Sequence, residues 1–270
     1  MIHWNVSPEI FSIGPLTIRW YGLLFASSFI AGFFIMDKIF KKEGKTEDDL
    51  NDLVWYMILG TVIGARLGHC LFYNPGYYLS HPLEILMIWK GGLASHGAAV
   101  GILTAIFYYS KKKKNMPYLW VMDRVVITVA LAAFFIRIGN LFNSEIVGKP
   151  TDVPWAFIFE RAYVPDPMTP RHPTQLYEAI AYLLIFFLLI YLYKKKDGKI
   201  ESGLFLGIFM TLIFGFRIFV EFFKEVQEPF EKGLPLDMGQ ILSIPLVIAG
   251  LYLIRRALNL KKGNENKIQS

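Results

Sequence analysis

Seven apolar stretches follow one another along the chain and are separated by shorter polar connections. They cover residues 16–40, 50–73, 92–109, 119–142, 174–193, 203–223 and 238–258. Each stretch is close to the ~20 residues that an α-helix needs to cross the hydrocarbon core of a bilayer. The pattern therefore predicts an all-α polytopic membrane bundle of seven transmembrane helices, in which residues 1–270 form a single integral-membrane domain.

Two connections are long enough to carry structure of their own. Residues 74–91 contain an apolar patch at 83–89, so we expect this loop to be half-immersed in the membrane interface. Residues 143–173 form the longest non-spanning stretch and are rich in proline. Residues 1–15 are polar and aromatic, and we expect an interfacial lead-in to the first helix.

Basic residues alternate in density between successive connections, which predicts the orientation of the helices. Lysine and arginine are retained preferentially on the cytoplasmic side of a membrane. They cluster after the first, third, fifth and seventh stretches, at residues 38–45, 111–114, 194–199 and 255–267. The N-terminus is therefore predicted outside and the C-terminus inside, with loops 74–91 and 143–173 extracytoplasmic. Six or eight spans would break this alternation.

Composition narrows the class of protein. The chain is 54% hydrophobic, which is too apolar for an ordinary soluble domain. Its net charge of +6 arises from the basic clusters between apolar stretches, so it indicates membrane orientation and not a nucleic-acid partner. The single cysteine, Cys70, excludes an intramolecular disulfide and a multi-cysteine metal site. We expect neither a metal nor a cofactor.

Polar side chains gather at one predicted depth of the membrane. Every stretch contributes at its outer end, through Arg19 and Tyr21, Arg66 and His69, His96, Arg137 and Asn140, Gln175 and Tyr177, Arg217 and Glu221, and Gln240. Ionisable groups are expensive inside a bilayer and usually mark function. The distribution predicts an arginine-rich site that faces the outer leaflet.

The densest polar motif closes the fourth stretch, at residues 137–148. On a helix, Arg137, Asn140 and Ser144 would fall near one face. Arginine stays ionised and presents a planar fork, so Arg137 and Arg217 suit a phosphodiester. A snorkelling Arg137 with polar helix-end neighbours is the structural alternative. Glu221 lies four residues after Arg217, within pairing distance, and a structural ion pair there is compatible with a binding role.

His96 and Tyr21 have open roles at this stage. His96 follows a pair of glycines that allow close backbone approach, and histidine can accept a proton near neutral pH. A structural histidine is the common alternative. Tyr21 could equally be an aromatic residue of the membrane interface.

Taken together, these motifs resemble the prolipoprotein diacylglyceryl transferase family over nearly the whole chain. The resemblance rests on Arg19-Trp20-Tyr21-Gly22, Gly64-Ala65-Arg66-Leu67-Gly68, Gly91-Gly92-Leu93-Ala94-Ser95-His96-Gly97, residues 137–148, His172-Pro173-Thr174-Gln175-Leu176-Tyr177-Glu178, Arg217 with Glu221, and Met238-Gly239-Gln240. Ala98 and Lys224 depart from the family pattern, where glycine and arginine are usual. We expect neither departure to touch the main motif.

The resemblance implies a transferase of the bacterial cytoplasmic (inner) membrane, whose active site faces the outer leaflet. Such an enzyme moves the diacylglyceryl group of phosphatidylglycerol, a membrane lipid, to the lipobox cysteine thiol in a preprolipoprotein signal peptide, and glycerol phosphate leaves. Arg137 and Arg217 would bind the lipid phosphate. Tyr21, Asn140, Gly148 and Glu221 match further positions of the lipid site. His96 is the candidate base, and Glu145 is its rival.

A transporter or flippase for an anionic lipid is the alternative from another class. It too would place arginines between helices. Internal symmetry and polar residues through the full membrane depth would be expected of it. The sequence shows neither clearly, so the transferase is favoured.

Overall fold

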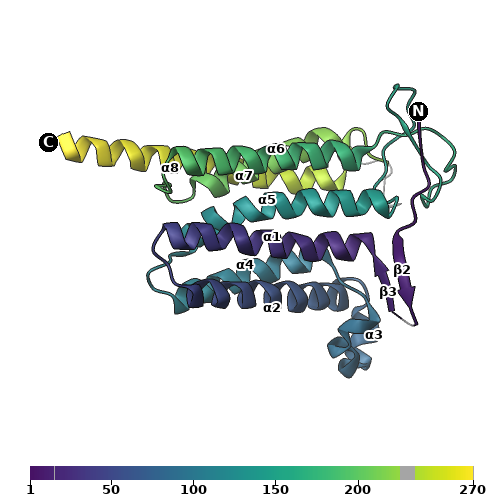
Figure 1. The fold of residues 1–270 in the computed structure, drawn as a ribbon, viewed down its shortest axis with the longest axis horizontal. Helices are drawn as coiled ribbons and strands as arrows, with labels where there is room; N and C mark the ends of the chain where they lie inside the picture. The colour runs from purple at the N-terminus through teal and green to yellow at the C-terminus, as the bar shows by residue number, and fades with distance from the viewer. Residues whose placement is uncertain (15, 226–234, 270) are drawn as a thin grey trace. The chain divides into compact units, whose positions relative to one another are not determined.

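The computed structural model describes residues 1–14, 16–225 and 235–269 (Figure 1). Seven long helices form most of it: α1 (Trp20–Lys42), α2 (Glu47–Phe72), α4 (Ser95–Lys112), α5 (Tyr118–Phe142), α6 (Thr174–Lys195), α7 (Leu204–Glu221) and α8 (Met238–Gln269). Three short helices lie between α2 and α4: α3 (Pro75–Ser80), η1 (Pro82–Leu86) and η2 (Ile88–Lys90). The strands are β1 (Ile2–Trp4), β2 (Glu9–Ile13), β3 (Leu16–Arg19) and β4 (Phe157–Phe159).

The chain is a polytopic helical membrane protein. Among the described residues, six helices are long and apolar enough to cross a bilayer, namely α1, α2, α5, α6, α7 and the Met238–Lys261 part of α8. The remaining long helix, α4, has 18 residues, ends in two lysines and is less apolar. The predicted domain of residues 1–270 also includes positions 15, 226–234 and 270, which lie outside the described residues.

The chain divides into two compact units, Met1–Ile35 with Asp123–Ser270, and Met36–Met122. In the second unit, α2 and α4 pack through glycines. A Cβ atom on Gly68 would lie 2.7 Å from the Cα atom of Gly97, so only a hydrogen fits there. Small residues at such crossings let two helix backbones approach closely inside a membrane.

In the first unit, α5 supports the start of α7. The carboxylate of Asp123 is fully buried and accepts hydrogen bonds from the backbone N–H groups of Gly203 (2.7 Å) and Leu206 (2.9 Å). The first N–H groups of a helix lack partners within the helix. Asp123 therefore caps α7 from another helix, which accounts for a charged residue in an apolar stretch.

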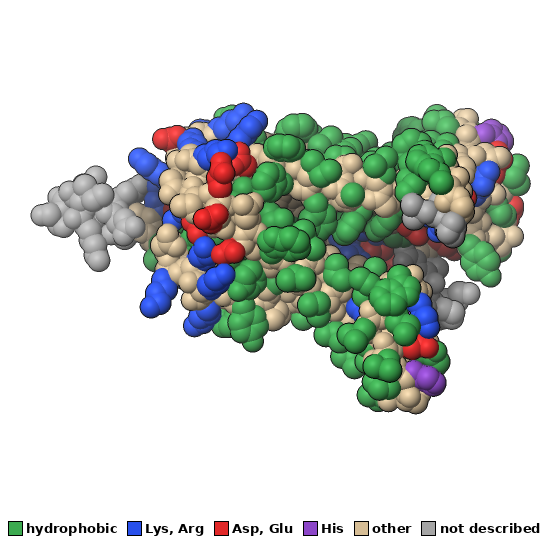
Figure 2. Space-filling model, turned by 60° about the horizontal axis from the view of Figure 1, so that its bottom comes forward, with side chains coloured by type: hydrophobic (Ala, Val, Ile, Leu, Met, Phe, Trp, Pro, Cys, Tyr) green, Lys and Arg blue, Asp and Glu red, His purple; other side chains and the backbone are tan. Residues whose placement is uncertain are grey.

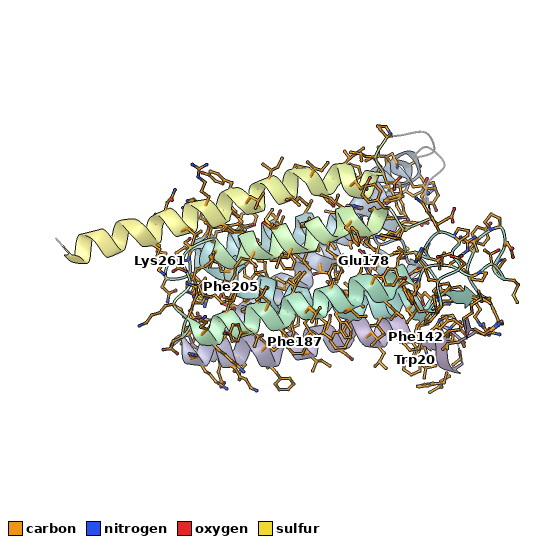
Figure 3. The ribbon with its side chains drawn as sticks, turned by 90° about the horizontal axis from the view of Figure 1, so that it is seen from above. Trp20, Phe142, Glu178, Phe187, Phe205 and Lys261 are labelled. Carbon is orange, nitrogen blue, oxygen red and sulfur yellow. The ribbon has the colours of Figure 1, made fainter. Side chains whose placement is uncertain are left out.

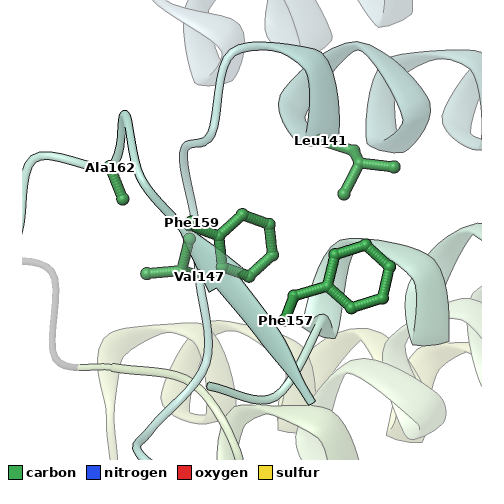
Figure 4. Close-up of a cluster of buried hydrophobic side chains, with 5 residues drawn as sticks. All are labelled: Leu141, Val147, Phe157, Phe159 and Ala162. Carbon is green, nitrogen blue, oxygen red and sulfur yellow. The ribbon is translucent and has the colours of Figure 1, made fainter. Parts of the chain in front are cut away.

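A short strand pairing outside the long helices joins the N-terminus to the 143–173 loop. Strand β1 pairs in parallel with β4, and the indole N–H of Trp4 donates to the carbonyl oxygen of Leu141 at 3.0 Å. A hydrophobic cluster around β4 reaches the end of α5 (Figure 4) and is made of Leu141, Val147, Phe157, Phe159 and Ala162. This cluster fixes the loop that leaves α5, which carries part of the candidate site.

Two local predictions were wrong. The first helix begins at Trp20, because residues 16–19 form β3 and pair with β2 in an exposed hairpin. Arg19 pairs there with Glu9 at 3.3 Å and is 62% exposed, so it is not part of a buried polar site. Helix α5 ends at Phe142, so Ser144 lies beyond the helix. The all-α class describes the long helices, and the four short strands lie outside them.

Candidate functional site

The guanidinium of Arg137 is held in place by three side chains. Its Nε lies 3.0 Å from Glu178 Oε2, and its Nη1 donates to Asn140 Oδ1 at 3.0 Å. Tyr182 also interacts with it. Only 13% of the Arg137 side chain is exposed. The arginine is thus oriented by contacts within the protein, and a structural snorkelling role does not account for them.

Glu178 is the acidic centre of the site. It is fully buried on α6 and lies between the helices, toward the end that holds Trp20 and Phe142 (Figure 3). Tyr182 donates to Glu178 Oε1 at 2.7 Å, and Lys224 Nζ lies 3.2 Å from Oε2. One carboxylate therefore joins Arg137 to Lys224. Buried charges of this kind are stable only when they are paired.

Lys224 and Arg217 complete the charged cluster around Glu221. Lys224 Nζ lies 3.0 Å from Glu221 Oε1, and the Lys224 side chain is buried. Arg217 Nε lies 3.4 Å from the same oxygen, as the four-residue spacing predicts. The Arg217 side chain is 33% exposed, compared with 3% for Lys224. Arg217 is therefore the most accessible cation of the cluster.

The expectation that Lys224 would not touch the main motif was wrong. Lys224 reaches Arg137 through the shared carboxylate of Glu178. An arginine at this position could bind Glu178 and Glu221 through separate nitrogens, whereas lysine uses a single nitrogen for both. The departure from the family pattern therefore lies in the wall of the site itself.

Asn140 links Arg137 to Glu145, and Tyr21 interacts with both of these residues. The amide nitrogen of Asn140 donates to Glu145 Oε1 at 2.6 Å, and Asn143 donates to the same oxygen at 3.2 Å. Tyr21 interacts electrostatically with Glu145 and Arg137. A Cβ atom on Gly139 would lie 2.7 Å from the Tyr21 ring, so this glycine makes room for the ring.

The turn that carries Glu145 is strained and firmly held. Ser144 and Ile146 have positive φ angles of 53° and 58°. Non-glycine residues in this region cost ~1–3 kcal/mol each and concentrate at functional sites. Gln175 Nε2 donates to the carbonyl oxygen of Glu145 at 2.7 Å, and Thr174 Oγ1 donates to that of Ile146 at 2.9 Å. The start of α6 thus keeps Glu145 directed back toward α5.

Gly148 lies where three segments meet. Its N–H donates to the carbonyl oxygen of His172 at 3.0 Å. A Cβ atom there would lie 2.5 Å from His172 Cβ and 2.8 Å from the carbonyl oxygen of Phe223. Close backbone packing therefore accounts for a glycine at this position.

The candidate base belongs to the second unit. His96 lies in the first turn of α4, and its side chain is exposed. Arg66, in the same unit, was expected among the polar residues of the outer-leaflet site. It is instead buried and donates to the backbone carbonyl oxygens of residues 84, 85, 91 and 92. Arg66 is therefore not available as an anion ligand in this conformation.

Seven of the eight predicted site residues lie in one contact network of the first unit. These are Tyr21, Arg137, Asn140, Glu145, Gly148, Arg217 and Glu221. Sequence reasoning missed the pairing roles of Glu178 and Lys224. The sequence did carry one signal for Glu178, because a glutamate one turn into an otherwise apolar helix needs a partner. Among the described residues, no group of three or more His, Cys, Asp or Glu side chains is placed to hold a metal ion.

Comparison with known proteins shows that the chain is similar to one family over most of its length. A family model described as prolipoprotein diacylglyceryl transferase matches residues 8–256. The phosphatidylglycerol–prolipoprotein diacylglyceryl transferase of Chloroherpeton thalassium is 54% identical over 253 residues, which cover 94% of this chain and 93% of that protein. The proteins of the same name from Tolumonas auensis and Bacteroides fragilis are each 45% identical, over 94% of this chain. These alignments cover 96% and 94% of the two relatives.

Proposed function

The chain belongs to the prolipoprotein diacylglyceryl transferase family, and on that premise we propose that it transfers a diacylglyceryl group from phosphatidylglycerol to the lipobox cysteine of a preprolipoprotein. The thiol sulfur attacks the carbon of the diacylglyceryl group that is bonded to the phosphate oxygen. A carbon–sulfur bond forms, the carbon–oxygen bond breaks, and glycerol phosphate leaves. A lipid transporter, considered from the sequence, has no support from the relatives.

The observation that carries this proposal is the balanced charge cluster of the first unit. Three cations, Arg137, Arg217 and Lys224, are matched by the carboxylates of Glu145, Glu178 and Glu221. Arg217 is the most accessible of these cations. Among the partners described for Arg137, Asn140 is the one that binds through a neutral amide oxygen. A phosphate oxygen makes a stronger, charge-assisted bond than an amide oxygen and can replace it.

In this proposal the two arginines act on the leaving group. Arg217 binds the lipid phosphate first. Arg137 binds it after a phosphate oxygen has displaced the amide oxygen of Asn140. Both then stabilise the negative charge that grows on the departing phosphate. Tyr21, Asn140, Gly148 and Glu221 shape the lipid site around them.

The thiol must lose its proton, because the thiolate is the nucleophile. We assign this proton to His96, whose ring is exposed at the start of α4. Glu145 already accepts hydrogen bonds from Asn140 and Asn143. Its carboxylate is therefore better suited to orienting Asn140, and it remains the rival base.

The strand pairing of the N-terminus supports seven membrane crossings. Because β1 pairs with β4, the residues before α1 and after α5 lie on one side of the membrane. The number of crossings between them must then be even. Helices α1, α2 and α5 supply three, so the fourth falls to α4.

Together with the positive-inside rule, this count favours an extracytoplasmic N-terminus and a cytoplasmic C-terminus. We propose a single domain in the bacterial inner membrane, with the site facing the outer leaflet and loops 74–91 and 143–173 outside. Labelling with an impermeant thiol reagent tests this. A Tyr163→Cys variant, at a fully exposed position, should react in intact cells, and Lys112→Cys should not. The opposite result would reverse the orientation.

Purified protein, phosphatidylglycerol vesicles and a synthetic lipobox peptide test the reaction directly. We expect the peptide mass to increase by one diacylglyceryl group, with one glycerol phosphate released for each modified peptide. Lipid movement between leaflets without either product would overturn the transferase assignment.

A further inference from the structure

The motif at residues 64–68 has no role in the reaction as described so far, although Arg66 is one of the most fully engaged side chains of the second unit. Its Nε donates to the carbonyl oxygen of Ile85 at 2.9 Å, and its Nη2 donates to that of Glu84 at 2.5 Å. Its Nη1 donates to the carbonyl oxygens of Gly91 (2.6 Å) and Gly92 (3.2 Å). All four bonds go to the backbone of one segment, residues 75–92, which connects α2 to α4.

That segment has no buried core of its own. None of the residues in α3, η1 and η2 is buried. Leu79, Leu83, Leu86 and Trp89 are each more than 70% exposed, and apolar side chains cover much of the segment in Figure 2. Its conformation is therefore fixed largely through the buried guanidinium of Arg66, which also lies over the Tyr78 ring at 5.0 Å.

Two glycines turn the chain toward Arg66. Gly91 and Gly92 have φ angles of 81° and 71°, which favour glycine. A Cβ atom on Gly92 would lie 2.9 Å from Arg66 Nη1 and 2.5 Å from His69 Cδ2. Both carbonyl oxygens consequently point to one guanidinium, immediately before α4 begins.

The same motif continues along the start of α4. The carbonyl oxygen of Ala65 accepts a hydrogen bond from the N–H of Ala94 at 2.9 Å. Gly68 then packs against the backbone of Gly97. The chain is thus held before and after His96 by successive residues of one α2 motif.

We infer that Arg66 is a positioning residue for His96, and not a ligand of the lipid phosphate. By fixing residues 84–92, it sets where α4 begins and hence where the His96 ring stands. This inference rests on the proposed function, with His96 as proton acceptor. A misplacement of ~1 Å can lower turnover ~100-fold.

The test is a double-mutant cycle, in which the kinetics of Arg66→Lys, His96→Asn and the double variant are compared. Lysine keeps the charge but cannot reach four carbonyl oxygens. We expect Arg66→Lys to lower kcat ~100-fold and to change the KM for phosphatidylglycerol less than ~3-fold. The double variant should be no slower than His96→Asn alone, because residues that act as a unit are not additive. Arg161→Lys, at an exposed position of the 143–173 loop, is the matched control and should keep wild-type kinetics.

Three results would overturn the inference: an unchanged kcat in Arg66→Lys, a loss confined to KM, or losses that multiply in the double variant. If Arg66→Lys does not fold, Gly92→Ala replaces it, because its methyl group would press on the His69 ring and on the same guanidinium, and its φ of 71° disfavours alanine. Unchanged kcat in Gly92→Ala would likewise count against Arg66. If wild-type protein fails to release glycerol phosphate, the proposed function fails, which is a separate result.

Discussion

Replacing Glu178 by glutamine is the most informative single change in the charged cluster. The substitution keeps the size of the side chain and removes its negative charge. Arg137 Nε and Lys224 Nζ, at 3.0 Å and 3.2 Å, would both lose their shared carboxylate. Arg137 would keep Asn140, and Lys224 would keep Glu221.

The size of the effect follows from burial. The Glu178 side chain is 0% exposed and that of Lys224 is 3% exposed, so water cannot replace the lost charge. Removing one partner of a buried ion pair costs ~3–5 kcal/mol. We therefore expect Glu178→Gln to lower the free energy of unfolding by ~3 kcal/mol or more. Turnover should fall ~100-fold, because Arg137 has lost the carboxylate that holds its Nε in place.

Thermal unfolding in detergent and turnover with phosphatidylglycerol measure the two effects. Glu160→Gln is the control, because its ion pair with His3 lies at the surface and should contribute ~1 kcal/mol or less. Lys224→Met added to Glu178→Gln should recover part of the stability, since it removes a buried cation that has lost one of its two carboxylate partners. Wild-type stability and turnover in Glu178→Gln would refute the role given to this carboxylate.

Two further predictions concern single residues. His96→Asn should keep the fold and lipid binding while lowering the chemical step, measured by single-turnover kinetics; an unchanged rate would transfer the role of base to Glu145. Gly148→Ala should lower the free energy of unfolding by ~1–3 kcal/mol through overpacking against His172 and Phe223. Gly76→Ala, where a Cβ atom meets nothing within 4 Å, should leave the melting temperature unchanged, and equal effects of the two substitutions would contradict the packing argument.

The long helices could be predicted because each has a continuous apolar pattern of membrane length. The end of α5 at Phe142 and the start of α6 at Thr174 lie where the sequence placed them. The start of α1 was predicted at residue 16 but lies at Trp20, because a short apolar run such as residues 16–19 is equally compatible with a strand. The β1–β4 pairing joins residues that are 155 positions apart, and local patterns carry no information about such partners.

The candidate site was predicted by residue type and depth, and only in part by contact. The sequence indicated Arg137 and Arg217 as an anion site, and it placed Glu221 within reach of Arg217. It did not show that Glu178 already holds Arg137, because their contact joins two different helices. Arg66 has the same residue type and predicted depth as Arg137, yet its donors face backbone carbonyl oxygens. Only the tertiary structure distinguishes these two arginines.

The central claim, that Arg137 binds the lipid phosphate with an oriented guanidinium, is tested most directly by Arg137→Lys. Lysine keeps the charge but cannot bond Glu178 and a phosphate oxygen through separate nitrogens of one plane. The measurement is turnover with phosphatidylglycerol at saturating lipobox peptide, on variants that unfold at the wild-type temperature. Loss of a donor to the developing charge costs ~100–1,000-fold, so we expect a decrease of that order for Arg137→Lys and essentially no turnover for Arg137→Ala. A near-wild-type rate for Arg137→Lys would show that a point charge suffices, and activity in Arg137→Ala would contradict the assignment of the site.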